Sequence, residues 1–171
     1  MDPYRNHAFI SLGSNMGDSV QNIQAACTLL KQHSTSSFLQ SSLWKTTPVD
    51  CPPNSPLFIN AAIGLIPDYN TNALDFLHYL QLLENRFGRT PKKVLNEPRP
   101  LDLDLITFKN LRLDSLELTL PHPRAHLRRF VLQPLCEIAP NLLLPGQSET
   151  VEHLLKKLPP DALMSKISAD I

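Results

Sequence analysis

The sequence has no excess of charge of either sign, because 16 lysines and arginines balance 16 aspartates and glutamates. Proteins that bind nucleic acid or anionic membrane surfaces usually carry a basic excess, so we expect neither partner. The 3 cysteines form no CxxC pair and no zinc-binding spacing, which suits a reducing cytoplasm. Apolar runs are far shorter than the roughly 20 residues of a membrane span, and the N-terminus lacks the pattern of a signal peptide.

Glycine is scarce, with 5 residues in 171, and no glycine-rich phosphate-binding motif occurs. The chain has no G-x-x-x-x-G-K-[ST] loop, no G-x-G-x-x-G turn and no kinase catalytic loop. The hydrolase pattern G-x-S-x-G and the zinc-protease pattern H-E-x-x-H are absent as well. If ATP binds to this protein, side chains rather than a glycine cradle must hold its phosphates.

Proline, by contrast, is abundant and gathers in two segments. Residues 46–56 contain four prolines, and residues 89–100 contain three more. Because proline fixes φ and removes a backbone donor, neither segment suits a regular element. Long ordered loops in compact domains are often functional. With 42% hydrophobic residues in 171, we expect one domain over residues 1–171 with long proline-rich active-site loops.

Hydrophobic periodicity predicts the regular elements between these loops. The expected strands are 7–12, 38–45, 58–66 and 101–108, and the expected helices are 19–32 and a segment from a cap at Asn70 or Thr71 to Gly88. A short hairpin after residue 110, a helical turn at 121–127 and a helix at 149–158 follow. The order β-α-β-β-α-β predicts an α+β, ferredoxin-like sandwich, in which helices pack on one face of an antiparallel sheet. This architecture hosts many functions.

The sharpest chemical signal is the pair Asp102 and Asp104 within the last main strand. Residues two apart in a strand project from the same face, so the two carboxylates point together while the flanking leucines point to the core. Two adjacent carboxylates repel each other unless a cation lies between them. Mg²⁺ commonly takes one or two carboxylates and completes its shell with water and phosphates. A solvated strand face with two unrelated aspartates is the other interpretation.

Cationic side chains stand near this pair. Arg99 precedes it and suits either a bidentate phosphate contact or an ion pair with the aspartates. Further along, His122 is followed by a dense basic run of Arg124, His126, Arg128 and Arg129. Such a run suits a polyphosphate ligand, or else forms an exposed basic turn.

Taken in order, these segments resemble the hydroxymethyldihydropterin pyrophosphokinase family of folate biosynthesis over about residues 7–145. Residues 146–171 would then be a C-terminal helical extension. The matching pieces are Leu12-Gly13-Ser14-Asn15, Thr46-x-Pro48, Phe58-Ile59-Asn60-Ala61-Ala62, Gly88-Arg89, Pro98-Arg99-x-x-Asp102-Leu103-Asp104-Leu105, Pro121-His122 and Arg128-x-Phe130-Val131-Leu132.

The resemblance implies that a hydroxymethyl oxygen of 6-hydroxymethyl-7,8-dihydropterin attacks the β-phosphorus of ATP and that AMP leaves. It implies two Mg²⁺ ions on Asp102 and Asp104, and contact with neighbouring folate-pathway enzymes is possible. Catalytic roles fall on Asp102, Asp104, Arg99 and Arg89. Nucleotide contacts fall on Gln81, Glu84, Arg89, Arg99, His122 and Arg128, and pterin contacts fall on Thr46, Val49, Phe58, Asn60 and Phe130.

The chain departs from the family pattern in its second proline-rich loop. Asn96 and Glu97 stand where the family usually has Trp-Gly, and Pro91 replaces a second loop arginine, for which Lys92 or Lys93 could substitute. Glu117 stands where some members have an arginine that contacts ATP. We therefore expect weaker closure over ATP and slower turnover than in a typical member.

Three other interpretations stay open at this point. The chain could be a catalytically weak or silent relative that binds pterin or nucleotide. It could be another metal-dependent phosphotransferase or phosphohydrolase that uses the same aspartates. It could also be an interaction module without chemistry, which binds a protein along its sheet.

Overall fold

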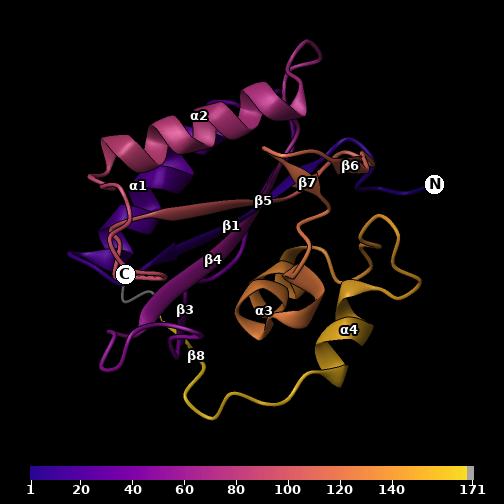
Figure 1. The fold of residues 1–171 in the computed structure, drawn as a ribbon. Coiled ribbons are helices and arrows are strands. Elements are labelled where there is room, and N and C mark those ends of the chain that lie inside the picture. Colours follow the sequence, from indigo (N-terminus) through magenta and orange to yellow (C-terminus); the bar gives the residue numbers. More distant parts are fainter. Residues whose placement is uncertain (169–171) are drawn as a thin grey trace.

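The computed structural model describes residues 1–168 and is built on one antiparallel sheet (Figure 1). Its strands are β1 (Ala8–Ser14), β2 (Phe38–Gln40), β3 (Trp44–Thr46), β4 (Phe58–Leu65), β5 (Asp102–Phe108) and β8 (Ser165–Lys166). They lie in the order β5-β1-β4-β3-β8, and β2 also pairs with β4. Every residue of β1 and β4 is buried, so these two strands form the centre of the molecule.

One strand was expected over residues 38–45, but the structure divides it into β2 and β3. The division falls at Ser41, whose backbone N–H donates to the Ala62 carbonyl at 2.9 Å. The Ser41 hydroxyl accepts from the Ala62 N–H, also at 2.9 Å. A side-chain oxygen therefore replaces a backbone carbonyl in the ladder, and the strand is interrupted there.

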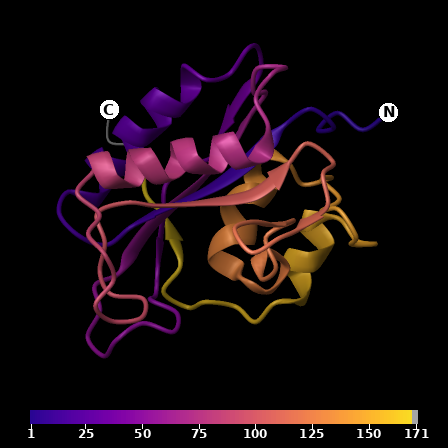
Figure 2. The same ribbon diagram turned by 45° about the horizontal axis from the view of Figure 1, so that its top comes forward.

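Helices α1 (Ser19–Lys31) and α2 (Ala73–Arg86) pack side by side on one face of the sheet (Figures 1 and 2). Their buried faces close over inward-facing residues of β1 and β5 such as Ile10, Leu12 and Leu103. Asp18 caps α1, because its side chain accepts from the Gln21 N–H at 3.0 Å. The cap of α2 is Asn72, rather than the expected Asn70 or Thr71, because the Asn72 side chain accepts from the Asp75 N–H at 2.9 Å.

The expectation of helices on one face only was wrong. Helices α3 (Arg129–Ile138) and α4 (Val151–Lys157) pack under the opposite face of the sheet (Figure 2). Phe9, Ala62 and Ile106 form an apolar patch on that face, and both helices bury residues against it. Helix α3 was not predicted, because Pro134 lies within it and reads in the sequence as a helix breaker.

The remaining elements are short. Strands β6 (Leu113–Asp114) and β7 (Thr119–Leu120) form the expected hairpin. The expected turn at 121–127 contains a short 3₁₀ helix, η1 (Ala125–Leu127). No helix among the described residues is both long and apolar enough to cross a membrane.

Candidate active site

A cavity of about 290 Å³ opens where β1, β4 and β5 meet the two proline-rich loops. Every residue that the sequence predicted for the site contributes to its lining: Thr46, Val49, Phe58, Asn60, Gln81, Glu84, Arg89, Arg99, Asp102, Asp104, His122, Arg128 and Phe130. These residues come from segments more than 80 positions apart in the chain. The fold therefore gathers the predicted positions into one pocket.

Strand register explains the floor of this cavity. Gly13 on β1 pairs with Asp102 on one side and with Asn60 on the other. An atom added at the Cβ position of Gly13 would lie 3.1 Å from the Asn60 Oδ1 and 3.5 Å from the Phe58 ring. Glycine thus keeps open the space between the acidic strand and the aromatic side of the pocket. The only sequence signal for this role was a glycine inside a strand.

Asp102 is held between two arginines. One carboxylate oxygen accepts from the Arg89 Nη1 at 2.7 Å, and the other accepts from the Arg99 Nη2 at 2.8 Å. Burial favours the neutral form of this carboxyl group, but the guanidinium groups of Arg99 and Arg89 outweigh it and hold the pKa of Asp102 below its ordinary value. Arg99 therefore forms an ion pair with Asp102, one of the two aspartates that the sequence offered as its partners.

Asp104 has a different environment, although it projects into the same pocket. Among residues 1–168, no group donates a hydrogen bond to its carboxylate. Burial, and then the negative charge of Asp102, raise the pKa of Asp104 to about 6. An ionised Asp104 thus adds negative charge that a cation would relieve. Two carboxylates, one of them without a partner, are a donor set that fits Mg²⁺.

Glu84 on α2 supports this arrangement from behind. Its carboxylate accepts from the Leu103 N–H at 2.8 Å and from the Arg89 side chain. Burial is the main reason that the pKa of Glu84 is raised to about 7. Because Glu84 contacts both β5 and Arg89, it holds the Arg89 side chain in position to bond to Asp102.

The position of Arg99 is fixed by its backbone. Its N–H donates to the Asn15 Oδ1 at 2.9 Å, and its carbonyl accepts from the Asn15 N–H at 3.2 Å. The guanidinium carbon lies 5.4 Å from the centre of the Phe58 ring. Its buried Nε has no hydrogen-bond partner among residues 1–168. A buried donor without a partner is costly, so this atom suits an anionic ligand.

A cationic wall made of Arg124 and Arg128 faces the aspartates, and His122 lies beside it. Burial, followed by the charges of Arg128 and Arg124, lowers the pKa of His122 to about 4. The His122 Nδ1 accepts from the Arg124 N–H at 3.2 Å, so the proton of the neutral ring resides on Nε2. Arg129, the last member of the basic run, points elsewhere and donates to three backbone carbonyls.

The opposite end of the cavity is lined by aromatic and uncharged polar side chains. Thr46, Phe58 and Asn60 are all buried there. The Asn60 Nδ2 donates to the Thr46 hydroxyl, which sets the orientation of the amide. Phe130 lines the same end, with the Arg128 guanidinium 5.5 Å from its ring centre. Aromatic faces next to an oriented amide suit a flat heterocycle with donors and acceptors on its edge.

Comparison with known proteins decides which family this chain represents. The family model described as 7,8-dihydro-6-hydroxymethylpterin-pyrophosphokinase matches residues 9–140. The chain belongs to this family. A 2-amino-4-hydroxy-6-hydroxymethyldihydropteridine pyrophosphokinase of Bacillus subtilis is 37% identical over 134 residues, or 78% of each chain. The enzyme of the same name from Haemophilus influenzae is 35% identical over 88% of this chain and 91% of its own.

A solved structure shows the same fold. The wild-type HPPK-DHPS protein of Plasmodium falciparum, crystallised with pteroate, aligns with a TM-score of 0.69 and 14% sequence identity. The alignment covers 89% of this chain but only 44% of that one. This pyrophosphokinase therefore corresponds in fold to less than half of the longer protein.

The positions at which this pyrophosphokinase departs from the family pattern have clear structural roles. The Asn96 side chain donates to the Asp50 carbonyl at 2.7 Å, which joins the two proline-rich loops. Asn96 and Lys92 both line the cavity. The Glu97 carboxylate accepts from the Lys93 N–H at 3.1 Å within its own loop.

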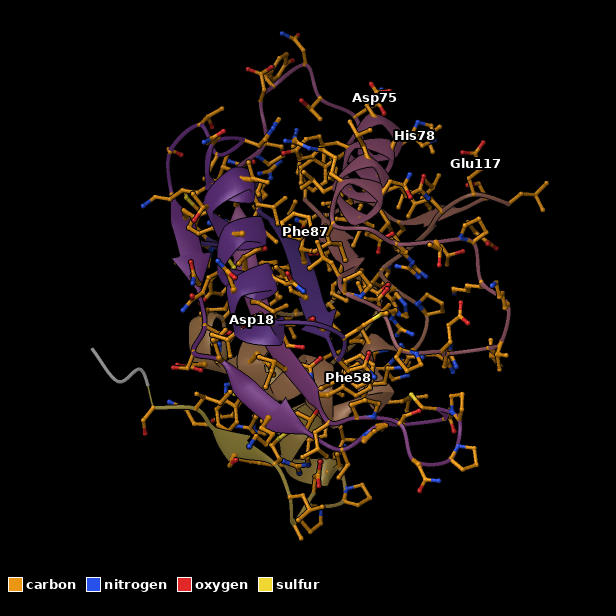
Figure 3. The ribbon with its side chains drawn as sticks, turned by 90° about the vertical axis from the view of Figure 1, so that its left-hand side faces the viewer. Asp18, Phe58, Asp75, His78, Phe87 and Glu117 are labelled. Carbon is orange, nitrogen blue, oxygen red and sulfur yellow. The ribbon has the colours of Figure 1, made fainter. Side chains whose placement is uncertain are left out.

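Glu117, the other departure, does not line the cavity. Its carboxylate lies 3.2 Å from the Nε2 of His78 on α2, and both side chains are more than half exposed. Figure 3 shows this pair at the upper edge of the molecule, well away from Phe58. The acidic substitution is therefore accommodated by a surface histidine.

Proposed function

We propose that this chain transfers the pyrophosphate group of Mg-ATP to the hydroxymethyl group of 6-hydroxymethyl-7,8-dihydropterin in folate biosynthesis. The row Asp102–Gly13–Asn60 across three strands carries the proposal. This row places Asp102 and Asp104 in the same cavity as the aromatic and amide side chains of Phe58 and Asn60. Family membership and the names of the two bacterial relatives agree with this reaction.

The pterin ring belongs in the end of the cavity that is lined by Phe58, Asn60 and Phe130. The Phe58 and Phe130 rings would stack against its faces, and the Asn60 amide would read its edge with Thr46 in support. Val49 would close the pocket from the first proline-rich loop. Burial of Thr46 and Asn60 favours this assignment, because a polar pair that is already buried needs a polar ligand edge to complete its hydrogen bonds.

The triphosphate belongs against the cationic wall. Arg89, Arg99 and Arg128 would contact phosphate oxygens, the Nε2 of His122 would donate to another, and Gln81 and Glu84 would lie near the nucleotide. Two Mg²⁺ ions on Asp102 and Asp104 would neutralise phosphate charge and align the triphosphate. For Mg²⁺ to reach Asp102, Arg89 and Arg99 must turn from its carboxylate to the phosphates.

The reaction then requires positioning rather than a covalent intermediate. The hydroxymethyl oxygen forms a bond to the β-phosphorus, and the bond from that phosphorus to the oxygen bridging it to the α-phosphorus breaks. AMP leaves and one proton is released. Alignment and charge neutralisation are the main protein contributions to such a transfer. The two proline-rich loops would exclude water, which otherwise competes as a nucleophile.

The wider setting is part of the same proposal. The order β5-β1-β4-β3 of the main strands supports a ferredoxin-like class for this single domain of residues 1–171. The free thiols of Cys27, Cys51 and Cys136 favour a reducing cytoplasm. The longer HPPK-DHPS relative suggests contact with a neighbouring enzyme of the pathway.

The test is product formation from Mg-ATP with and without the pterin. We expect AMP, rather than ADP or free phosphate, only when the pterin is present, and no AMP after Mg²⁺ is chelated. ADP or phosphate would instead indicate another phosphotransferase or a phosphohydrolase. No turnover, together with calorimetric binding of pterin and an ATP analogue, would indicate a silent relative.

A further inference from the structure

The chain beyond α4 returns to the sheet and ends beside the pterin side of the cavity. Residues 159–168, here called the strap, leave the lower helices, cross the base of the molecule and reach β3 through β8 (Figures 1 and 2). The strap lies outside the segment that matches the family model, which ends at residue 140. The contacts of the strap itself therefore indicate its role.

Arg129 anchors the start of the strap. Its Nε donates to the Pro159 carbonyl at 2.7 Å, and its Nη2 donates to the Leu158 carbonyl at 2.8 Å. Arg129 begins α3 between Arg128 and Phe130, which both line the cavity. The strap is thus fixed at the edge of the site by a charged donor that bonds to backbone carbonyls.

The end of the strap extends the sheet. In β8, Lys166 pairs with Trp44 and Ser165 pairs with Lys45, while the Ile167 N–H donates to the Leu43 carbonyl at 2.8 Å. Without β8, β3 would be a three-residue edge strand with unpaired backbone groups. The strap therefore holds the strand whose last residue, Thr46, orients Asn60.

Between these anchors, one side-chain contact ties the strap to the first proline-rich loop. The Thr47 hydroxyl donates to the Asp161 carboxylate at 3.0 Å. The other oxygen of Asp161 accepts from the Leu163 N–H, also at 3.0 Å, which orients the carboxylate. A hollow of about 290 Å³ otherwise separates the strap from Val49 and Phe130. The loop position beside the pterin pocket thus depends on this tie.

We propose that Asp161 is a positioning residue for the pterin, acting through Thr47 and the strand that bears Thr46. This inference rests on the proposed function, because it assigns the ligand at that end of the cavity. Among residues 1–168, the Asp161 side chain forms hydrogen bonds with no cavity-lining residue other than Thr47, and a single surface hydrogen bond contributes little to global stability. Its effect is local: it limits the movement of residues 46–49, which would otherwise have to be ordered when the ring binds.

Full-length Asp161→Ala and Thr47→Val variants, alone and combined, test the tie. We expect each single change to raise the KM for the pterin about five-fold, the effect of one hydrogen bond. The KM for ATP and the midpoint of thermal unfolding should stay at the wild-type values. Because Thr47→Val removes only a bond that Asp161→Ala also removes, the double variant should be no worse than Asp161→Ala alone. Asp161→Asn keeps an acceptor oxygen and should restore most of the affinity.

Asp68→Ala is the matched control, since Asp68 also accepts from a backbone N–H two residues on but lies far from the cavity. Trp44, the one tryptophan of the chain, lies 5.4 Å from the Lys166 Nζ and reports strap docking by its fluorescence whether or not the enzyme turns over. A pterin KM unchanged in Asp161→Ala would overturn the inference, as would additive effects in the double variant. Absence of AMP from the wild type would instead reject the proposed function, with the fluorescence still reporting on the strap.

Discussion

The two ends of the cavity are built by opposite means. At the proposed pterin end, Thr46, Phe58 and Asn60 are buried and the Thr46–Asn60 hydrogen bond is already formed. At the proposed phosphate end, Arg89 and Arg99 each donate one hydrogen bond to Asp102. One end is arranged before any ligand binds, whereas the other must exchange ion pairs within the protein for ion pairs with the ligand.

This difference follows from the ligands themselves. A flat, neutral ring gains most from a rigid slot, because ordering side chains on binding would cost affinity. A triphosphate with its cations brings several charges, and arginines left without an anion in a partly buried site would be costly. On the proposed assignment, Asp102 would pair with the arginines until phosphate replaces it, and Asp104 would take the cation.

The largest effect is expected from a substitution at the proposed phosphate end. Asp104→Asn keeps the size of the side chain but removes its charge, so Mg²⁺ loses one of its two carboxylates. We expect kcat to fall at least about 100-fold, as when one preorganised electrostatic group is removed from an active site, while the pterin KM changes little. AMP formation measures both. Asp114→Asn, at an exposed position of β6, is the control. An equal fall in the kcat of this control would contradict the assignment of Asp104 as a Mg²⁺ ligand.

The next effect concerns the support behind Asp102 and its arginines. Glu84→Ala leaves the buried Leu103 N–H without its acceptor and removes one of the two carboxylates that Arg89 contacts. We expect the free energy of unfolding to drop by about 3 kcal/mol, as measured by urea denaturation. Glu117→Ala removes the exposed partner of His78 and should cost less than about 1 kcal/mol. Similar losses in the two variants would show that Glu84 is not a structural support.

These residues also mark what the sequence could and could not predict. The period of two in a strand placed Asp102 and Asp104 on one face correctly, because that geometry is local. The family resemblance supplied positions that all line one cavity. The supporting role of Glu84 depends on how α2 packs against β5, and the role of Gly13 depends on the strand register. No local sequence pattern contains either of them.

The fold was predictable to a similar depth. Three of the four expected strands and the helices α1 and α2 follow hydrophobic periodicity, and they appear within a few residues of the expected bounds. Helix α3 was missed because Pro134 lies inside it, where local rules count proline against a helix. The packing of α3 and α4 on the second face of the sheet and the interruption of the strand at Ser41 arise from tertiary contacts. The secondary-structure propensities of single residues do not encode such contacts.

A smaller effect tests the loops that bridge the two ends. Asn96→Gly keeps the positive φ of that residue while removing the amide that reaches Asp50. We expect a rise of about three-fold in the KM for ATP, from the loss of one exposed hydrogen bond, and faster cleavage of both loops by thermolysin. Asn54→Gly, at another positive-φ position in the first loop, should behave as wild type. Equal effects in both would assign the change to loop flexibility rather than to the Asn96 contact.

The smallest effect concerns the scaffold of the pterin end. Burial favours the neutral form of Glu137, but hydrogen bonds from Ser42 and Trp44 outweigh it and hold the pKa of Glu137 below its ordinary 4.5. The unfolded chain therefore takes up a proton first as pH falls. The stabilisation is complete above about pH 4.5 and disappears as pH falls through the lower folded-state pKa.

Urea denaturation across this range measures the effect of Glu137. The stability gap between wild type and Glu137→Gln should be constant from pH 6 to 8 and shrink below pH 4.5. A gap that widens on acidification would contradict this account of the Glu137 contacts.

Steady-state AMP assays with both substrates varied, on Asn60→Ala and Arg128→Ala in parallel, test the division of the cavity most directly. Our account predicts that Asn60→Ala raises the KM for the pterin about ten-fold or more and leaves the KM for ATP near its wild-type value. Arg128→Ala should do the reverse. If both variants raise the same KM, or if each raises both equally, the assignment of a pterin end and a phosphate end is wrong.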